Sequence, residues 1–371
     1  MKLAAAIFIL AALLVSGCPA PPENNQPPAT GSRYFYLGFT PFPYDFTSGA
    51  LVETYQLLPQ NADIIAHHFD DGIPWPEALS GATYDQNITS GLDFRLAQLA
   101  DYDAVYLALT PVNNTRDGLA KYWGEQSNLP LPEGWQELGF NHPNVVAAYI
   151  NHCRYMIERF KPDYMAYGIE ANLLYELNPS LFPDYLEMAS RVYVALKAEY
   201  PDLPLFITIQ IDSYHRNPDI QEPAIRQLLE LSDMVAVSSY PYTDYGDPDT
   251  MPSEWFSRVA ALAPEKPFAI AETGFIAEDL HLSQRGIEIT GTPQYQSEYI
   301  DFLLAEAEEL QAEFVIWFVI RDYDLGWQLM ESLGVDELFK LWRDSGLLDG
   351  DGQSRPGLEV WRIWLARARV Q

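Results

Sequence analysis

Short apolar runs recur along the chain, and longer stretches with helical spacing of apolar residues separate them. The runs predict buried strands at residues 34–40, 63–69, 104–110, 164–170, 205–211, 234–240, 268–272 and 314–320. The stretches between them predict helices at 184–199, 225–230, 253–262 and 295–310, among others. Strands that alternate with helices form parallel βαβ units. Eight such units predict an α/β protein folded as a single-domain (β/α)8 barrel, or TIM barrel.

The connections on the two sides of the predicted strands differ in length. Those that enter a strand are short and turn-like, such as PQNAD before the second strand and APEKP before the seventh. Those that leave a strand are long and polar, for example 111–142 and 321–346. In such barrels the long βα loops build the active site, so we expect the site at the carboxyl ends of the strands. A doubly wound open sheet is the competing architecture, but GFTPFPYD, not a glycine-rich phosphate-binding sequence, stands in the first strand and the turn after it.

The N-terminal segment predicts export and a lipid anchor. Residues 1–17 contain one lysine and an apolar run that is too short to span a bilayer, as in a secretory signal peptide. The sequence VSGC, which ends at Cys18, resembles a bacterial lipobox; an ordinary signal peptide is the alternative. The resemblance implies that Cys18 is lipidated. The proline-rich composition of residues 18–32 predicts an extended tether, and the barrel is expected at 33–371. The expected location is extracytoplasmic, anchored to a bacterial membrane in the periplasm or at the cell surface.

Composition and charge narrow the classes of function. The chain has 371 residues, of which 48% are hydrophobic and 13% aromatic, and this is enough apolar material for a large core. The 22 basic and 52 acidic residues give a net charge of −30, which repels nucleic acids and anionic lipid headgroups. We therefore expect no nucleic-acid partner and no membrane contact except through a lipid anchor. Cys153, in an apolar helical stretch, is expected to be a buried and inert thiol.

Two glutamates stand at the ends of predicted strands. Glu170 ends the fourth strand in the sequence YGIE, and Glu272 ends the seventh in AIAE. A charge at the inner end of an apolar strand is costly unless it has a partner or a role. Across a barrel mouth, one carboxyl group could protonate a glycosidic oxygen while the other, ionised, acts as the nucleophile. The structural alternative is that Glu170 pairs with an arginine or lysine and that Glu272 caps a helix.

This pair of glutamates resembles the catalytic pair of clan A retaining glycoside hydrolases. These are (β/α)8 enzymes that include cellulases, mannanases, β-glucanases and the endo-β-1,4-galactanases, the subfamily that we favour. The resemblance implies hydrolysis of β-linked oligosaccharides or polysaccharides, with Glu170 as general acid/base, Glu272 as nucleophile and no metal or organic cofactor. It also implies that Tyr240, in the sequence SYP, donates to Glu272 and that Trp317 forms the floor of the sugar site. Ile169 departs from the family pattern, in which an asparagine at this position binds the sugar 2-hydroxyl.

Further residues near the strand ends are candidate sugar ligands. Trp75, Trp123 and Trp135 lie in loops, where they either stack on sugars or pack the loops down. Successive strand residues point to opposite faces, so His67 and His68 cannot both enter the barrel, and we expect no metal site. The residues that we predict to bind substrate are Asn172, Tyr240, Trp317, His67, Asp70 and Trp75.

A second function remains open at the same barrel mouth. A noncatalytic surface lipoprotein could bind glycan there, and Ile169 is the main support for this alternative. A retaining mechanism requires the two carboxyl groups to lie about 5 to 5.5 Å apart, and not roughly 6.5 Å or more. A wider separation, or separate salt bridges for Glu170 and Glu272, would argue against catalysis.

Overall fold

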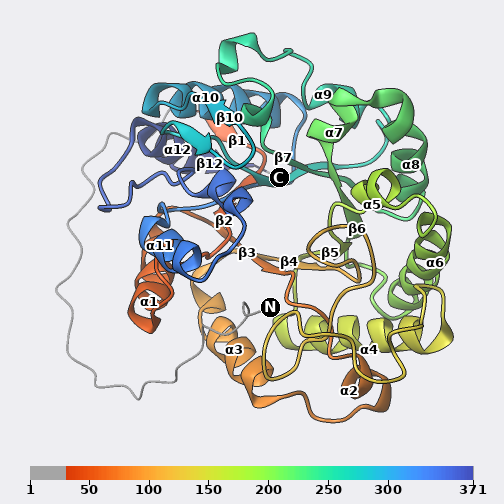
Figure 1. Ribbon diagram of the computed structural model, residues 1–371. Coiled ribbons are helices and arrows are strands. Elements are labelled where there is room, and N and C mark those ends of the chain that lie inside the picture. The colour runs from red at the N-terminus through yellow and green to blue at the C-terminus, as the bar shows by residue number, and fades with distance from the viewer. Residues whose placement is uncertain (1–30, 371) are drawn as a thin grey trace.

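The computed structural model in Figure 1 describes residues 31–370 and contains a closed barrel of eight parallel strands. The strand order is β11-β2-β3-β4-β5-β6-β7-β8. The strands are β2 (Tyr36–Phe39), β3 (Ile64–Phe69), β4 (Ala104–Leu109), β5 (Tyr164–Gly168), β6 (Leu205–Gln210), β7 (Val235–Ser239), β8 (Phe268–Thr273) and β11 (Phe314–Trp317). Each lies within or nearly within one of the eight predicted runs, so the predicted (β/α)8 barrel is confirmed.

Helices surround the barrel as a ring (Figure 1). They are α1 (Ser48–Leu57), α2 (Trp75–Ser80), α3 (Gln86–Leu96), α4 (Pro143–Phe160), α5 (Asn172–Leu177), α6 (Phe182–Glu199), α7 (Ile211–Arg216), α8 (Pro218–Glu230), α9 (Ser257–Ala260), α10 (Pro293–Glu309), α11 (Asp324–Ser332) and α12 (Pro356–Leu365). The predicted helices at 184–199, 225–230 and 295–310 correspond to α6, α8 and α10. The prediction at 253–262 is wrong in extent, because only the single turn of α9 forms there.

Two small sheets and a few 3-10 turns complete the fold. The ends of the described chain pair in parallel as β1 (Ser32–Arg33) and β12 (Ala368–Arg369), and β9 (Leu280–Leu282) forms a hairpin with β10 (Ile287–Ile289). The 3-10 turns are η1 (Leu58–Gln60), η2 (Leu99–Asp101), η3 (Pro241–Thr243), η4 (Pro248–Thr250) and η5 (Glu337–Trp342). Within residues 31–370 no helix combines the length and apolar character needed to cross a bilayer. The predicted signal peptide, Cys18 and most of the tether lie outside the described residues.

The inside of the barrel is filled by a mixture of small and large side chains. Alanines from several strands leave room for a cluster of three rings, in which Tyr106 lies 5.8 Å from Phe206 and 5.0 Å from Phe314 between centroids. The other faces of the strands pack against the helices, where Cys153 of α4 is fully buried as predicted. The barrel centre is therefore a packed core, and any ligand site must lie above it.

The strand that precedes Glu170, β5, and the strand that contains Glu272, β8, are both irregular just before these residues. The pairing of β5 with β6 shifts between Ala166 and Gly168, and the pairing of β7 with β8 shifts between Ile270 and Glu272. An extra residue in a strand changes which face the following side chains occupy, and such irregularities are common beside active sites. Strict alternation from Ala269 and Ala271, which lie inside the barrel, would turn Glu272 away from it. The shift allows Glu272 to face the mouth.

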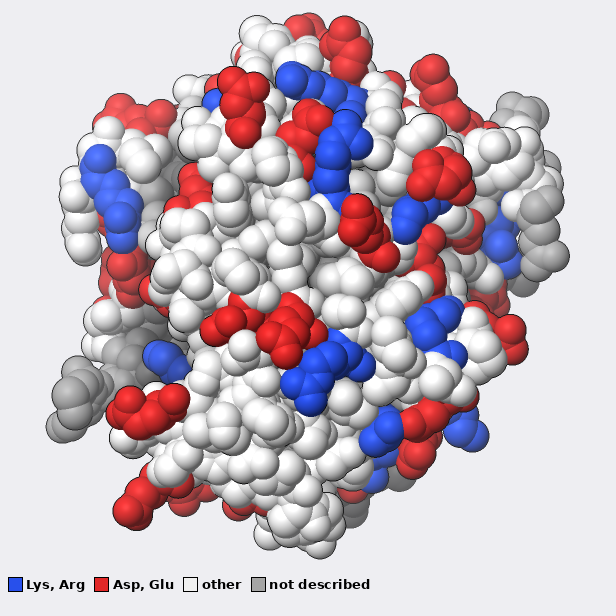
Figure 2. Space-filling model, turned by 90° about the vertical axis from the view of Figure 1, so that its right-hand side faces the viewer, with Lys and Arg blue, Asp and Glu red and all other residues white. Residues whose placement is uncertain are grey.

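The surface carries acidic and basic side chains in close alternation. Figure 2 shows Lys and Arg side chains standing beside Asp and Glu on the face over α5, α6 and α8. Ion pairs such as Arg154 with Glu199 and Arg191 with Glu187 occur on α4 and α6. The net charge of −30 therefore coexists with local charge pairing on this face.

Candidate active site

Glu170 and Glu272 line the same small cavity at the carboxyl end of the barrel. The cavity has a volume of about 10 Å³, and its other lining residues are His68, Tyr106, Ile169, Thr208, Ser238 and Ala271. This volume is enough for about one water molecule. The two glutamate side chains are 17% and 19% exposed, so solvent reaches them from the mouth. A sugar ring would have to bind on the solvent side of these carboxylates.

Glu272 is held by one cationic and one neutral partner. His68 Nδ1 lies 3.0 Å from Glu272 Oε2, and the Tyr240 hydroxyl donates to Glu272 Oε1 at 2.6 Å. Burial opposes the charged form of Glu272, but His68 and the Tyr240 hydrogen bond outweigh it and lower the pKa of the carboxyl group. Burial likewise opposes the charged form of His68, and the Glu272 carboxylate outweighs it and raises the pKa of the imidazole. The two groups stabilise each other as an ion pair.

Glu170 has different partners. Ser238 Oγ donates to Glu170 Oε1 at 2.6 Å, and Arg116 Nε lies 3.2 Å from Glu170 Oε2. The backbone N–H of Glu170 donates to Thr208 Oγ1 at 2.9 Å. Glu170 has φ of +50°, a left-handed backbone conformation that is rare for residues other than glycine and costs about 1 kcal/mol. Such strain is kept where the surrounding structure fixes it, which is typical of functional sites.

Arg116 connects Glu170 to the end of β3. Its Nη1 lies 2.7 Å from Asp70 Oδ2, and Arg116 itself has φ of +58°. Asn128, also left-handed with φ of +57°, donates from Nδ2 to the backbone oxygen of Asp70 at 3.0 Å. The long loop after β4 is thus bound to Asp70, just after β3, and to Glu170, just after β5. Of the two substrate ligands predicted at the end of β3, His67 and Asp70, Asp70 is the one that lies at the mouth.

Each glutamate therefore has its own cationic partner. Arg116 pairs with Glu170, as the structural alternative predicted. The alternative is wrong for Glu272, since the next helix, α10, is capped by Thr292 instead. The Tyr240 contact with Glu272 that the resemblance implied is present.

Asp212 fixes the position of the Tyr240 backbone. The buried Asp212 carboxylate accepts from the Tyr240 N–H at 3.0 Å and from Ser239 Oγ at 3.0 Å. Gln210 Nε2 donates to the same carboxylate at 2.5 Å. Burial raises the pKa of Asp212 to about 7, although the hydrogen bonds from Tyr240 and Ser239 act in the opposite direction. Asp212 therefore fixes the backbone from which Tyr240 reaches Glu272.

Asn172 does not face the barrel mouth, and its predicted contact with substrate is contradicted. The side chain is fully buried. Its Nδ2 donates to the Gln210 backbone oxygen and to Gln221 Oε1, both at 2.9 Å, and its Oδ1 accepts from the Gln210 N–H at 2.9 Å. Both ends of the amide are thus occupied by protein groups. Asn172 joins α5 to β6 and cannot replace the donor that Ile169 lacks.

Two other predicted ligands face the helix layer. His67 is fully buried and packs against Phe160, with centroids 5.2 Å apart, and burial lowers its pKa well below the usual value. Its neighbour His68 enters the barrel instead, as only one of the two histidines can. Trp317 also points outward, donates its indole N–H to the Ser345 backbone oxygen at 2.8 Å, and is fully buried. The predictions that His67 binds substrate and that Trp317 forms the sugar floor are therefore wrong.

The three loop tryptophans pack the loops down. Trp75 is fully buried, donates to the Ala120 backbone oxygen at 2.9 Å and stacks on Trp135 with centroids 5.8 Å apart. Trp123 lies 5.9 Å from Phe69 at the end of β3. The predicted role of Trp75 as a sugar ligand is wrong, and the packing alternative is correct.

Three residues of the site were missed in the sequence. His68 lies on the same side of β3 as Ile64 and Ala66, which line the barrel, but the sequence does not show which side of the strand faces inward. Ser238 could have been noted because it lies at the carboxyl end of a strand. No sequence signal marks Arg116, which reaches Glu170 from 54 positions away in an irregular loop.

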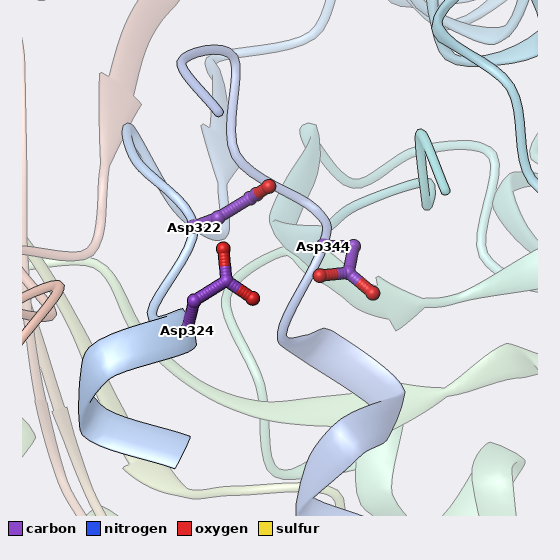
Figure 3. A group of neighbouring side chains, drawn as sticks. All are labelled: Asp322, Asp324 and Asp344. Atoms are coloured by element: carbon purple, nitrogen blue, oxygen red, sulfur yellow. The ribbon is translucent and has the colours of Figure 1, made fainter. Parts of the chain in front are cut away.

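In the described part of the chain, three aspartates that follow β11 form a cluster. Oxygens of Asp322, Asp324 and Asp344 lie within 4.8 Å of one another (Figure 3). Two arginines meet these charges: Arg355 Nη1 donates to Asp322 Oδ1 at 2.9 Å, and Arg343 Nε donates to Asp344 Oδ1 at 2.7 Å. The cluster is thus part of an ion-pair network that connects the loop after β11 to the start of α12.

Solved structures share the architecture. An exo-β-1,4-mannosidase from Opitutaceae bacterium strain TAV5 matches with a TM-score of 0.62 and 14% identity, over 91% of this chain and 60% of that chain. A GH5_18 protein from Streptomyces cattleya, solved in complex with Manβ1-4GlcNAc, matches with a TM-score of 0.61 and 15% identity, over 90% and 81%. The GH53 catalytic domain of Ignisphaera aggregans matches with a TM-score of 0.52 and 18% identity, over 90% and 91%.

These similarities concern the fold. This chain spans 60% of the mannosidase and 35% of a Bacteroides uniformis β-glucuronidase that it also matches. No protein-family model matches the chain, and no curated protein matches it in sequence. At such identities, the shared structure shows that this chain has the (β/α)8 barrel on which those glycosidases are built.

Proposed function

We propose that the protein hydrolyses β-linked glycans by a retaining mechanism, with Glu272 as nucleophile and Glu170 as general acid/base. The observation that carries the proposal is that both glutamates, Glu170 just after β5 and Glu272 in β8, line one cavity at the barrel mouth. Retaining hydrolysis needs two carboxyl groups in different environments. The exo-β-1,4-mannosidase and the GH5_18 protein, which was solved in complex with Manβ1-4GlcNAc, support this class of substrate.

The surroundings of Glu272 suit a nucleophile. A nucleophilic carboxylate must be ionised and must point its free lone pairs at the anomeric carbon. His68 and Tyr240 keep Glu272 ionised and fix its orientation. Tyr240 is in turn held by Asp212, so the orientation does not depend on substrate.

Glu170 lines the same cavity as Glu272, and we assign proton transfer to it. Arg116 is a shared partner, because the same guanidinium also pairs with Asp70. A sugar at the mouth would compete with solvent and with Arg116 for the Glu170 oxygens. In the proposed mechanism Glu170 protonates the leaving oxygen and then removes a proton from the incoming water.

Hydrolysis of a panel of β-galactan, mannan, xylan and β-glucan tests the proposal. We expect release of reducing ends from at least one glycan, and a loss of about a thousandfold or more in Glu272→Gln. Glu288→Gln, on the exposed β10 strand, is the matched control and should keep full activity. Proton NMR of the first product should show retention of the anomeric configuration; inversion would contradict the assigned roles.

Glu170 is tested by comparing leaving groups. Glu170→Ala should slow hydrolysis of the natural glycan by about a hundredfold or more, because acid assistance is lost. Aryl glycosides with good leaving groups need little assistance, so their first step should be affected much less. A variant that cleaves the natural glycan at the wild-type rate would rule out Glu170 as the acid/base.

Binding of glycan without hydrolysis is the second candidate function. The Arg116 contact with Glu170 favours it, together with Ile169 in place of a sugar-binding asparagine. Calorimetry with the same glycans distinguishes the two candidates. Equal binding by wild type and Glu272→Gln, with no release of reducing ends from any glycan, would support the binding protein and exclude the hydrolase.

We also propose that the barrel is lipid-anchored outside the cytoplasm through Cys18. The lipobox-like sequence supports this proposal. Labelling with a fatty-acid analogue in a bacterial host should mark the wild type and leave Cys18→Ser unlabelled. Labelling of both proteins would contradict the anchor at Cys18.

A further inference from the structure

The tryptophans fall into two groups by exposure. Of the nine in the chain, seven are buried. The other two, Trp342 and Trp364, are partly exposed. Trp364 lies 5.8 Å from Phe35, just before β2 begins, and so belongs to the amino end of the barrel. Trp342 lies at the other end, 5.8 Å from the ring of Tyr240.

The rings continue outward from the site. Tyr240 donates to Glu272, Trp342 meets Tyr240 edge-on at 73°, and Phe339 lies 6.2 Å beyond Trp342. Phe339 is 43% exposed. We call Tyr240, Trp342 and Phe339 the aromatic strip. Exposed rings of this kind offer an apolar surface on which the C–H faces of sugars can pack while sugar hydroxyls stay hydrated.

The segment that carries Trp342 is fixed on both sides. The Tyr242 hydroxyl donates to the backbone oxygen of Leu341. On the other side, Asp322 Oδ1 accepts from the Gly346 N–H at 2.7 Å, and Arg355 Nη1 donates to the Gly346 oxygen at 2.9 Å. The aspartate cluster of Figure 3 therefore holds the turn that follows Trp342. A binding surface that is already ordered loses little entropy when a ligand docks.

We infer that the aromatic strip binds the sugar chain on the glycone side of the scissile bond, so that the substrate is a neutral β-linked oligosaccharide or polysaccharide. The inference rests on the proposed function. Glu272 bonds to the glycone sugar, and the strip begins at the tyrosine that contacts Glu272. Trp342 and Phe339 extend the strip beyond that sugar, which indicates further sugar units in the same direction. The net charge of −30 disfavours polyuronates.

Chain-length dependence tests the inference. We would measure kcat/KM on β-1,4-linked manno-, galacto-, cello- and xylo-oligosaccharides from the disaccharide upward, and their binding to Glu272→Gln. Wild-type kcat/KM should rise with length. Trp342→Ala should lose about tenfold on the longest substrate and little on the shortest, as expected for loss of one central aromatic contact. Trp342→Phe should keep most of the rise, and Trp364→Ala should match wild type.

The outcomes separate the two proposals. If Trp342→Ala keeps the wild-type dependence on length, the aromatic strip is wrong and the hydrolase stands. If no sugar is cleaved but long oligosaccharides bind and Trp342→Ala weakens that binding, the strip stands and hydrolysis is wrong. If no oligosaccharide is cleaved or bound, both are wrong. Circular dichroism of each variant checks that the barrel is folded.

Discussion

Arg116 Nε lies 3.2 Å from Glu170 Oε2. Arg116 belongs to the long loop between β4 and α4, which contains no helix or strand. The same guanidinium contacts Asp70, and its side chain is only 9% exposed. Removal of Arg116 would leave two carboxylates close together with no positive partner. Loss of one partner costs about 3–5 kcal/mol in a fully buried pair. Since Asp70 and Glu170 are partly exposed, we expect Arg116→Met to lose about 2 kcal/mol in the free energy of unfolding.

Urea denaturation measures this loss, and an exposed pair provides the control. Arg154 pairs with Glu199 on the surface, where the two side chains are 35% and 42% exposed. Arg154→Met should therefore lose less than about 1 kcal/mol. Equal losses in the two variants would show that the Arg116 pair is not an important contact at the mouth.

His68 should control the acid side of the pH profile. The His68 imidazolium, together with the Tyr240 hydroxyl, lowers the pKa of Glu272 against the effect of burial. In His68→Gln the positive charge is absent, so the pKa of Glu272 rises and less of the nucleophile is ionised at low pH. We expect the acidic limb of kcat/KM to move to higher pH.

The control for this variant is an exposed histidine that pairs with neither Glu170 nor Glu272. His281, on β9, is exposed and lies 3.9 Å from Glu288. His281→Gln should leave the pH profile unchanged. An unchanged acidic limb in His68→Gln would mean that His68 does not set the ionisation of Glu272, or that Glu272 does not limit the rate.

The fold was predictable because the strands are runs of apolar residues between polar turns. The carboxyl ends of parallel strands meet at one face, so Glu170, Glu272 and Tyr240 could be placed together without coordinates. The orientation of individual side chains was not predictable. Both faces of a barrel strand are buried, so apolar alternation does not tell which face points inward. This is why the sequence does not favour His68 over His67. The role of Trp317 was implied by the family resemblance, which does not give the direction of its side chain.

Long-range contacts set the remaining part of the site. Arg116, which contacts Glu170, has a left-handed backbone, and the loop sequence shows no glycine at that position to signal it. Trp342 is one of nine tryptophans, and the sequence does not show that seven of the others are buried. The register shifts in β5 and β8 also leave no mark in an apolar run.

Asn172 should contribute to stability and not to sugar affinity. Its amide makes three hydrogen bonds in a fully buried place, and its removal leaves Gln210 and Gln221 groups without partners. We expect Asn172→Ala to lower the free energy of unfolding by about 2–3 kcal/mol. At a temperature where the variant is folded, KM for the glycan should stay close to wild type. A KM increase of about tenfold without loss of stability would restore the predicted role in binding.

Asp212 should make stability depend on pH in a defined window. Burial raises its pKa to about 7 in the folded protein, above the ordinary value of 3.8. Between these two values the folded state holds a proton that the unfolded state releases, so this group lowers stability as pH rises from about 4 to about 7. Asp212→Asn cannot ionise and should therefore lose less stability across that window than wild type does, with the difference reaching a few kcal/mol at most. Thermal unfolding at pH 4, 5, 6 and 7 measures the two slopes, with the exposed Asp249→Asn as control. Parallel curves for wild type and Asp212→Asn would show that Asp212 stays ionised in the fold and that the hydrogen bonds from Tyr240 and Ser239 outweigh its burial.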